Sequence, residues 1–296
     1  MKKIFSMIYS LCILFNCPLT GWWDAGHLAV AQIAYEELQP EVKDKVDAYL
    51  AGVSADFPDH SDFISASIWA DGIRFDGVDC FSSWHISSRP YDPEKILSSE
   101  EHQNILLRME NNDLVWIIGQ SLKTLSNPQS SSWARGFMLR LLIHMVGDLH
   151  QPLHCTTYYD SRHFPKGDRG GTRYCIADQK YGSLHYLFDG AFGLADRRTQ
   201  QPMTEEDAKY IEDLVSLLKK QFPRETLAEL REKHIDAWRQ ESYDIAVDVA
   251  YGKTAPFPNE CPTEDFMEEG KIVTAKRLAL AGYRLADLLN EVFTKV

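Results

Sequence analysis

The chain has 296 residues, 44% of them hydrophobic, and a formal net charge of −12 at pH 7. No stretch rich in Gly, Ser or Pro divides it, so we expect one domain with a sizeable core. An acidic surface does not attract polyanions over long distances, which excludes a protein that binds nucleic acid through a broad basic patch. A phosphodiester substrate would have to be captured locally, by metal charge and a few arginines.

The first residues have the pattern of a secretory signal peptide. Met1-Lys2-Lys3 is basic, Ile4 to Phe15 is an apolar run too short to span a bilayer, and turn-forming residues follow at Pro18-Leu19-Thr20-Gly21. We predict cleavage between Gly21 and Trp22, a secreted or periplasmic location and no stable membrane anchor. A retained amphiphilic anchor is the alternative, because the segment lacks an A-x-A cleavage pattern.

Export would place the chain in an oxidising compartment. Cleavage removes two cysteines and leaves an even number, Cys80, Cys155, Cys175 and Cys261, so we expect two disulfide bonds. Cys155 and Cys175 bracket a polar loop and are the favoured pair. Cys80 and Cys261 are paired only by elimination.

Apolar residues recur at helical spacing along most of the chain, and strand-like alternation is nearly absent. The expected helices are Leu28–Leu38, Val42–Leu50, Ile105–Leu125, Trp133–Leu149, Tyr210–Phe222, Leu227–Tyr251 and Ile272–Val292. Thr204 and Thr263, each followed by acidic residues, have the pattern of capped helix starts. The predicted class is all-α, in a single compact multi-helical domain.

A metal site is predicted at the end of the helix expected over Trp133–Leu149. His144 and Asp148 are four residues apart, so their side chains project from the same helical face and can hold one cation between them. Pro152 ends the helix, and the turn carries His154 back toward the same cavity. The His-x3-Asp-x5-His pattern suits two adjacent metals better than one.

A second pair, His185 and Asp189, repeats this four-residue spacing. A lone histidine on an apolar helix is more often a hydrogen-bonded core residue than a ligand. Imidazoles and carboxylates set among apolar neighbours carry a heavy desolvation cost unless they are paired or bind metal, so we favour the metal interpretation. The other histidines are interpreted as structural or as supporting the ligands: His60, His102, His150, His163 and His234.

A long irregular segment lies between His154 and Gly182, and it separates the two ligand pairs. It contains Gly167-Asp168-Arg169-Gly170-Gly171, which matches neither the dinucleotide-binding fingerprint nor the P-loop. A loop of this length in a compact domain is usually functional.

Three upstream motifs complete a recognisable pattern: Trp22-Trp23-Asp24-Ala25-Gly26-His27, Trp69-Ala70-Asp71-Gly72-Ile73-Arg74 and Ser83-Trp84-His85. Together with the motifs above, the chain resembles the zinc-dependent S1/P1 nuclease family. The resemblance runs from Trp22 to about Tyr251. It is carried by Trp22 with His27, Asp71 with Arg74, His85, the Gly147–His154 block, the Gly167–Gly171 loop, His185 with Asp189, and Glu241-Ser242.

The resemblance implies three zinc ions per chain, held by nitrogen and oxygen ligands of the kind that zinc accepts. The implied ligands are Asp71, His85, His144 and Asp148 for one ion; the amine and carbonyl of Trp22, His27 and a shared Asp148 for the second; and His154, His185 and Asp189 for the third. Metals bridged by Asp148 would activate a hydroxide that attacks phosphorus, with Asp71 and Asp148 as catalytic residues. Arg74 would stabilise the charge on phosphorus.

The chain departs from the family pattern at several positions. Family members usually have Asp three residues after the ligand His85, where this chain has Ser88. Thr172, Phe188 and Gly190 also replace the family's usual Asn, Trp and polar residue. These departures predict a low rate or an altered base preference, and they leave the metal ligands intact.

The implied function is hydrolysis of single-stranded RNA or DNA to 5′-nucleotides, with removal of 3′-phosphates as an additional activity, by a monomer. The alternative enzyme is a zinc-dependent phospholipase C, a related fold in which Asp189 would normally be Glu. A third interpretation is a zinc-stabilised binding protein with weakened catalysis. It is suggested by Ser88, which stands where family members usually have Asp.

Overall fold

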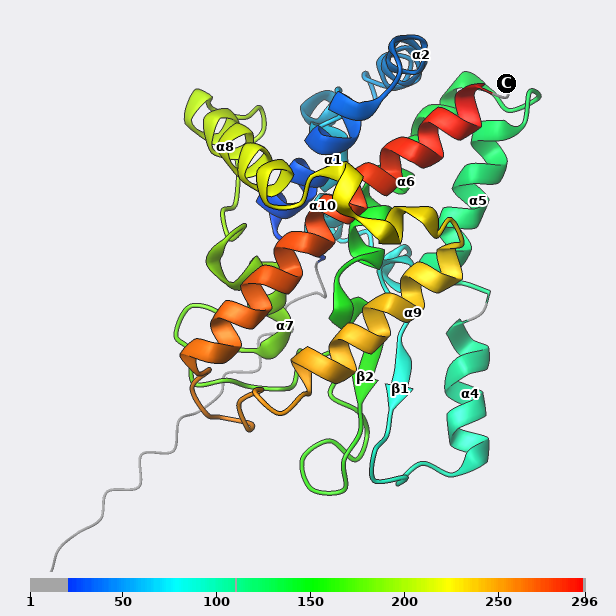
Figure 1. The fold of residues 1–296 in the computed structure, drawn as a ribbon. Helices are drawn as coiled ribbons and strands as arrows, with labels where there is room; N and C mark the ends of the chain where they lie inside the picture. Colours follow the sequence, from blue (N-terminus) through cyan, green and yellow to red (C-terminus); the bar gives the residue numbers. More distant parts are fainter. Residues whose placement is uncertain (1–20, 110, 295–296) are drawn as a thin grey trace, which may run out of the picture.

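The computed structural model describes residues 21–109 and 111–294, so the predicted signal peptide, apart from Gly21, lies outside the described residues. The described chain is mostly helical, which confirms the all-α prediction (Figure 1). Its helices are α1 Asp24–Glu37, α2 Pro40–Ala51, α3 Trp69–Phe75, α4 Ser99–Met109, α5 Leu114–Ser126, α6 Ser132–Leu149, α7 Leu184–Asp189, α8 Glu205–Gln221, α9 Ile235–Ile245 and α10 Glu264–Thr294. Among them, none has the length and apolar character needed to cross a membrane.

The core forms around α6 and α10. Every residue of α6 from Leu139 to Leu149 is buried, so this half of the helix is enclosed on all sides rather than amphipathic. The 31-residue helix α10 runs across the molecule and packs against α1 (Figure 1). Gly282 permits this close crossing, because a Cβ there would lie 2.6 Å from Ile33.

Two predicted helices are shorter than expected, for local reasons. The segment Ile105–Leu125 forms two helices, because Asp113 caps the start of α5 by accepting a hydrogen bond from the backbone N–H of Trp116 at 2.8 Å. The segment Leu227–Tyr251 begins with short 3₁₀ turns, forms α9 from Ile235 and ends in a π-helix over Ala246–Ala250. The predicted cap at Thr204 is present and forms a capping box with Asp207.

The two strands of the described chain are three residues long and pair in parallel. They are β1 Arg89–Tyr91 and β2 Thr156–Tyr158. The pairing extends toward the predicted ligands, because Ser87 N–H donates to the carbonyl of His154 at 2.9 Å. It thereby holds the segment that follows His85 beside the segment that contains His154.

The predicted disulfide bonds are wrong for this structure, in which none of the four described cysteines is bridged. Cys155 is buried, and its thiol lies 3.7 Å from the carbonyl of Leu149 at the end of α6, so it is part of the core. Cys261 is exposed, and its thiol donates to the carbonyl of Ala177 at 3.1 Å. The positions of Cys155 and Cys175 on either side of a polar loop therefore did not show whether their sulfur atoms are adjacent.

Candidate metal centre

The end of α6 supplies the central pair of the site. His144 and Asp148 are fully buried, and His144 Nε2 lies 3.2 Å from Asp148 Oδ2, as expected for side chains one helical turn apart. The helix ends at Leu149, and Pro152 begins a single 3₁₀ turn over Pro152–His154. This turn returns His154 to the site, with Nδ1 3.9 Å from Asp148 Oδ1.

His85 and Asp71 close the site from outside α6. His85 Nδ1 lies 2.9 Å from Asp148 Oδ2 and 3.1 Å from His144 Nε2. Asp71 Oδ1, on α3, lies 3.6 Å from His85 Nδ1 and 3.9 Å from His144 Nε2. These four side chains are the set predicted for one zinc ion.

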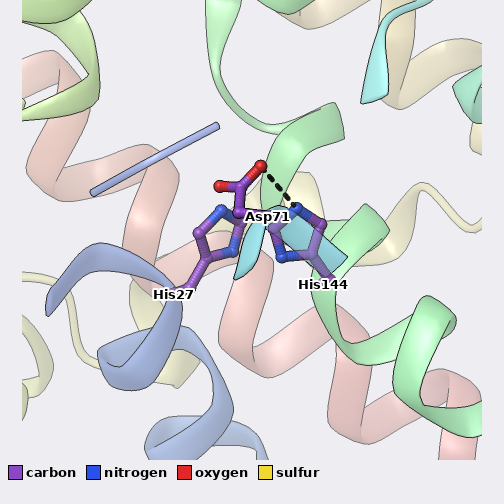
Figure 2. Close-up of side chains that lie close together, drawn as sticks. All are labelled: His27, Asp71 and His144. Atoms are coloured by element: carbon purple, nitrogen blue, oxygen red, sulfur yellow. Dashed lines mark ion pairs between the residues drawn. The ribbon is translucent and has the colours of Figure 1, made fainter. Parts of the chain in front are cut away.

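His27 enters from α1. Its Nε2 lies 3.3 Å from Asp148 Oδ1, and its ring stacks on that of His144 with centroids 4.0 Å apart. Figure 2 shows the two imidazoles beside each other, with the carboxylate of Asp71 next to them. Trp22 is fully buried close by, and its indole N–H donates to the carbonyl of Gly147 at 2.8 Å. The predicted N-terminal residue therefore lies at the site.

A second group contains His154, His185 and Asp189, all fully buried. The rings of His154 and His185 stack with centroids 5.1 Å apart, and His185 Nε2 lies 3.4 Å from Asp189 Oδ2. The side-chain amide of Gln151 donates to Asp189 Oδ1 at 2.6 Å. Gln151 thus holds one oxygen of the carboxylate and leaves the other directed at His185.

Backbone carbonyls fix the orientation of three histidines by accepting hydrogen bonds from Nδ1. His144 donates to Ser67 at 2.6 Å, His154 donates to His85 at 2.5 Å, and His185 donates to Gly170 at 2.6 Å. A ring whose Nδ1 carries the proton presents the lone pair of Nε2, which is the form that binds a metal.

The glycine-rich loop places the carbonyl of Gly170 beside His185. Asp168 is fully buried in this loop and accepts from the Tyr158 backbone N–H at 2.9 Å and from the Tyr251 hydroxyl at 2.6 Å. Gly170 has φ +60°, and a Cβ there would lie 2.5 Å from the carbonyl of Leu153. Only glycine therefore fits where the loop passes under the His154 turn.

The donor set fits metal ions. Three groups of side chains place their ligand atoms within 4.8 Å of one another: His27, Asp71 and His144; His85, His144 and Asp148; and His154, His185 and Asp189. Among the described residues, several of these buried atoms have no hydrogen-bond partner, namely both ring nitrogens of His27, Nε2 of His85, and one oxygen each of Asp71, Asp148 and Asp189. Buried polar atoms without partners are costly, so their convergence indicates a site that could hold cations.

Burial and the neighbouring carboxylates shift the pKa values of the three histidines around Asp148. Burial lowers the pKa of His27 and of His85, so both rings are neutral and able to bind metal. Burial also disfavours the charged form of His144, but Asp148 and Asp71 outweigh it and raise its pKa to about 9. Without metal, His144 therefore supplies the positive charge that a cation would otherwise provide.

Arg74 lies on α3 one turn after Asp71, as its spacing predicts. Its Nη1 is 3.7 Å from Asp71 Oδ1, and its side chain is 6% exposed. Within the described chain, its Nε and Nη1 have no hydrogen-bond partner. A buried guanidinium with unused donors beside the carboxylates is suited to an anionic substrate.

Sequence reasoning missed a buried ionic network behind the site. His150 donates from Nδ1 to the carbonyl of Val146, and its Nε2 accepts from Arg284 at 3.0 Å. Arg284 and Arg277 both donate to Glu241, at 2.6 to 2.8 Å. The Glu241-Ser242 motif was the only signal in the sequence, since the arginines sit among apolar residues of α10.

The structure and the comparisons together define the class of the protein. The family model described as S1/P1 Nuclease matches residues 22–294. Endonuclease 2 of Arabidopsis thaliana is 26% identical over 303 residues, which cover 97% of this chain and 96% of that protein. The chain belongs to the S1/P1 nuclease family, and this membership supports a hydrolase that acts on ester bonds of nucleic acids.

Proposed function

We propose that the protein is a zinc-dependent phosphodiesterase that hydrolyses single-stranded RNA and DNA to 5′-nucleotides, and that it also removes 3′-phosphates. The observation that carries this proposal is the convergence of three buried His/Asp groups in a chain of the S1/P1 nuclease family. A zinc-dependent phospholipase C has no comparable support, because the named relative is an endonuclease.

The proposed zinc ligands are the residues implied by the family pattern. Asp71, His85, His144 and Asp148 would hold one ion, and His154, His185 and Asp189 another. A third would be held by His27, Asp148 and the amine and carbonyl of Trp22. Zinc bound at such sites lowers the pKa of water toward neutrality and stabilises negative charge on phosphoryl oxygens.

The remaining chemistry belongs to side chains of this chain. Arg74 would donate its unused N–H groups to the phosphate, and Asp71 holds the guanidinium at 3.7 Å. Gln151 keeps Asp189 directed at His185, and the carbonyl of Ser67 keeps His144 Nε2 directed at Asp148. These contacts pre-organise the site before substrate arrives.

We also propose that the protein is exported, acts as a monomer and begins at Trp22 when mature. The position of Gly21 supports cleavage after this residue. A Cβ at Gly21 would lie 1.7 Å from Asp148 Oδ1 and 2.7 Å from His27 Nε2, so the residue before Trp22 fills the space beside the proposed bridging carboxylate. Removal of Gly21 would open that space and create an amine there.

A substrate panel tests the proposal. Protein beginning at Trp22 is assayed with single-stranded RNA, single-stranded DNA, a 3′-mononucleotide and phosphatidylcholine vesicles, with and without a chelator. We expect chelator-sensitive release of 5′-nucleotides. Hydrolysis of phosphatidylcholine alone would identify a lipase, and zinc binding without hydrolysis of any substrate would identify a binding protein.

A further inference from the structure

The face of α6 that carries the metal-site residues continues outward as an aromatic stripe. Trp133, Phe137, His144 and Asp148 are separated by four, seven and four residues, so they lie on one face of the helix. At 1.5 Å per residue, Phe137 lies about 10 Å and Trp133 about 16 Å from His144 along the axis. Trp133 and Phe137 thus lie near the start of the helix, on the face that leads inward to the buried His144 and Asp148.

Ring contacts connect this stripe to the segment that holds His85. Trp133 stacks on Phe137 with centroids 5.2 Å apart, Phe137 lies 6.3 Å from Phe81, and Phe81 lies 4.6 Å from Trp84. Trp84 immediately precedes His85. Phe81, Trp84 and Phe137 are partly exposed, and the rings form a continuous row from the segment that holds His85 to the surface.

Trp133 is exposed but fixed in place. It is 50% exposed, yet its indole N–H donates to Asp56 Oδ2 at 2.8 Å, and one ring face covers Phe137 at an interplanar angle of 8°. The opposite face has no ring packed on it among the aromatic contacts of the described chain. A large apolar side chain held in one orientation at the surface loses little conformational entropy on binding, which suits it to a flat ligand.

The charges near this row do not favour a ligand held only by its phosphate groups. Asp56 is negative, and the two arginines of α6 are already engaged: Arg135 donates to the Tyr49 hydroxyl and the Asn127 carbonyl, and Arg140 packs over the rings of Phe57 at 4.2 Å and Trp69 at 6.0 Å. Any strand that binds along this row would therefore be held mainly through its bases. This agrees with an acidic chain that lacks a broad basic patch.

We propose that the row Trp84–Phe81–Phe137–Trp133 is a stacking track for the bases of a single-stranded nucleic acid whose scissile phosphate lies at the metal centre. This inference rests on the proposed function and adds a second contact with the substrate. The distance of about 16 Å from His144 to Trp133 along the helix corresponds to about five steps of a stacked strand at about 3.4 Å each. Trp133 would therefore contact only substrates longer than a few nucleotides.

The test compares Trp133→Ala with the unmodified protein on oligoadenylates of two, four, six and eight nucleotides. Phe257→Ala is the matched control, because Phe257 is an aromatic residue that is 73% exposed outside the row. We expect Trp133→Ala to raise KM for the octamer about tenfold, which is about 1.4 kcal/mol, and to leave the dinucleotide unchanged. Phe257→Ala should behave like the unmodified protein at every length.

A modified substrate makes the result specific to stacking. An octamer whose distal nucleotides lack bases should bind the unmodified protein about tenfold more weakly, and Trp133→Ala should then add no further loss. Trp133→Phe keeps a ring and should restore part of the octamer affinity. Equal KM values for Trp133→Ala and the unmodified protein on an octamer that both hydrolyse would overturn the track while leaving the nuclease function intact.

Failure of the nuclease function would be recognised separately. If no strand is hydrolysed, binding of a fluorescein-labelled octamer to chelated protein is measured by anisotropy. Weaker binding by Trp133→Ala, but not by Phe257→Ala, would still support the track. Equal binding of all three proteins would overturn it.

Discussion

His27 Nε2 lies 3.3 Å from Asp148 Oδ1, although the two residues belong to α1 and α6. The other carboxylate oxygen of Asp148 lies 2.9 Å from His85 Nδ1. Asp148 therefore faces two separate ligand groups with its two oxygens, as a bridging carboxylate does. Its role as a bridge can be tested by changing this residue alone.

Asp148→Ala is expected to remove two of the three proposed zinc ions and to lower the free energy of unfolding, because metal-binding energy is also folding energy. Zinc is measured by elemental analysis of protein purified without added metal, and stability is measured by urea titration. Asp248→Ala, at an exposed position of the π-helix, should change neither quantity. Fewer than two zinc ions in the unmodified protein would contradict the cluster.

Extension of the N-terminus is expected to abolish most hydrolysis. An α-amino group has a pKa near 8 and can bind zinc when deprotonated, whereas a peptide nitrogen has no available lone pair. Forms that begin at Trp22 and at Met followed by Trp22 are compared for zinc content and activity. We expect the extended form to fold and to keep the ion held by His154, His185 and Asp189. Equal activity of the two forms would show that Trp22 is only a packed indole.

Ser88→Asp is expected to raise turnover on single-stranded nucleic acid. Ser88 is buried, its hydroxyl lies 2.6 Å from that of Thr157, and it lines a 270 Å³ cavity with room for a larger side chain, whose walls carry Arg89 and Arg239 as well as Asp113 and Asp236. Ser87→Asp is the contrasting variant, since Ser87 already bonds to the buried Asp113 and a second carboxylate there would be repelled. A lower kcat for Ser88→Asp with full zinc content would refute the prediction.

Asp168 is expected to make the chelated protein less stable as pH rises from about 4 to about 6. Burial raises its pKa to about 6, so across this range the folded state keeps a proton that the unfolded state has lost. Two pKa units correspond to about 3 kcal/mol at most. Urea titrations at several pH values should show this slope, and Asp168→Asn should make it less steep. Identical slopes in both proteins would contradict the assignment.

Arg284→Met is expected to lower the free energy of unfolding by about 1–3 kcal/mol, because the buried Nε2 of His150 loses its donor and the half-buried Glu241 keeps only Arg277. A double-mutant cycle with Glu241→Gln measures the interaction. The double variant should be less destabilised than the sum of the two single variants. Additive effects would show that the two residues act independently.

The proximity of the candidate ligands could be predicted because their spacing is local. His144 with Asp148 and His185 with Asp189 need only one helical turn each, and the structure brings each pair together as expected. Most helix positions were predicted for the same reason. The break at Asp113 was not, because a capping side chain overrides a continuous apolar pattern.

Features that depend on distant segments could not be read from the sequence. The carbonyls of Ser67 and Gly170 that orient the histidines carry no residue-type signal. The same holds for Arg277 and Arg284, whose partners lie 36 and 43 residues away on α9. The prediction of disulfide pairs was wrong for a similar reason, because the number of cysteines says nothing about the distances between them.

The hydrogen bonds that His144, His154 and His185 donate to main-chain carbonyls have an evolutionary consequence. A side-chain partner can be lost by one base change in the gene, but a carbonyl is present whichever residue occupies the position. Substitutions at the positions that supply these carbonyls therefore leave the hydrogen bonds that orient the rings in place. Substrate choice could drift through exchanges such as the one at Ser88 while the histidines stay in place, so a single scaffold can be inherited by enzymes with different preferences.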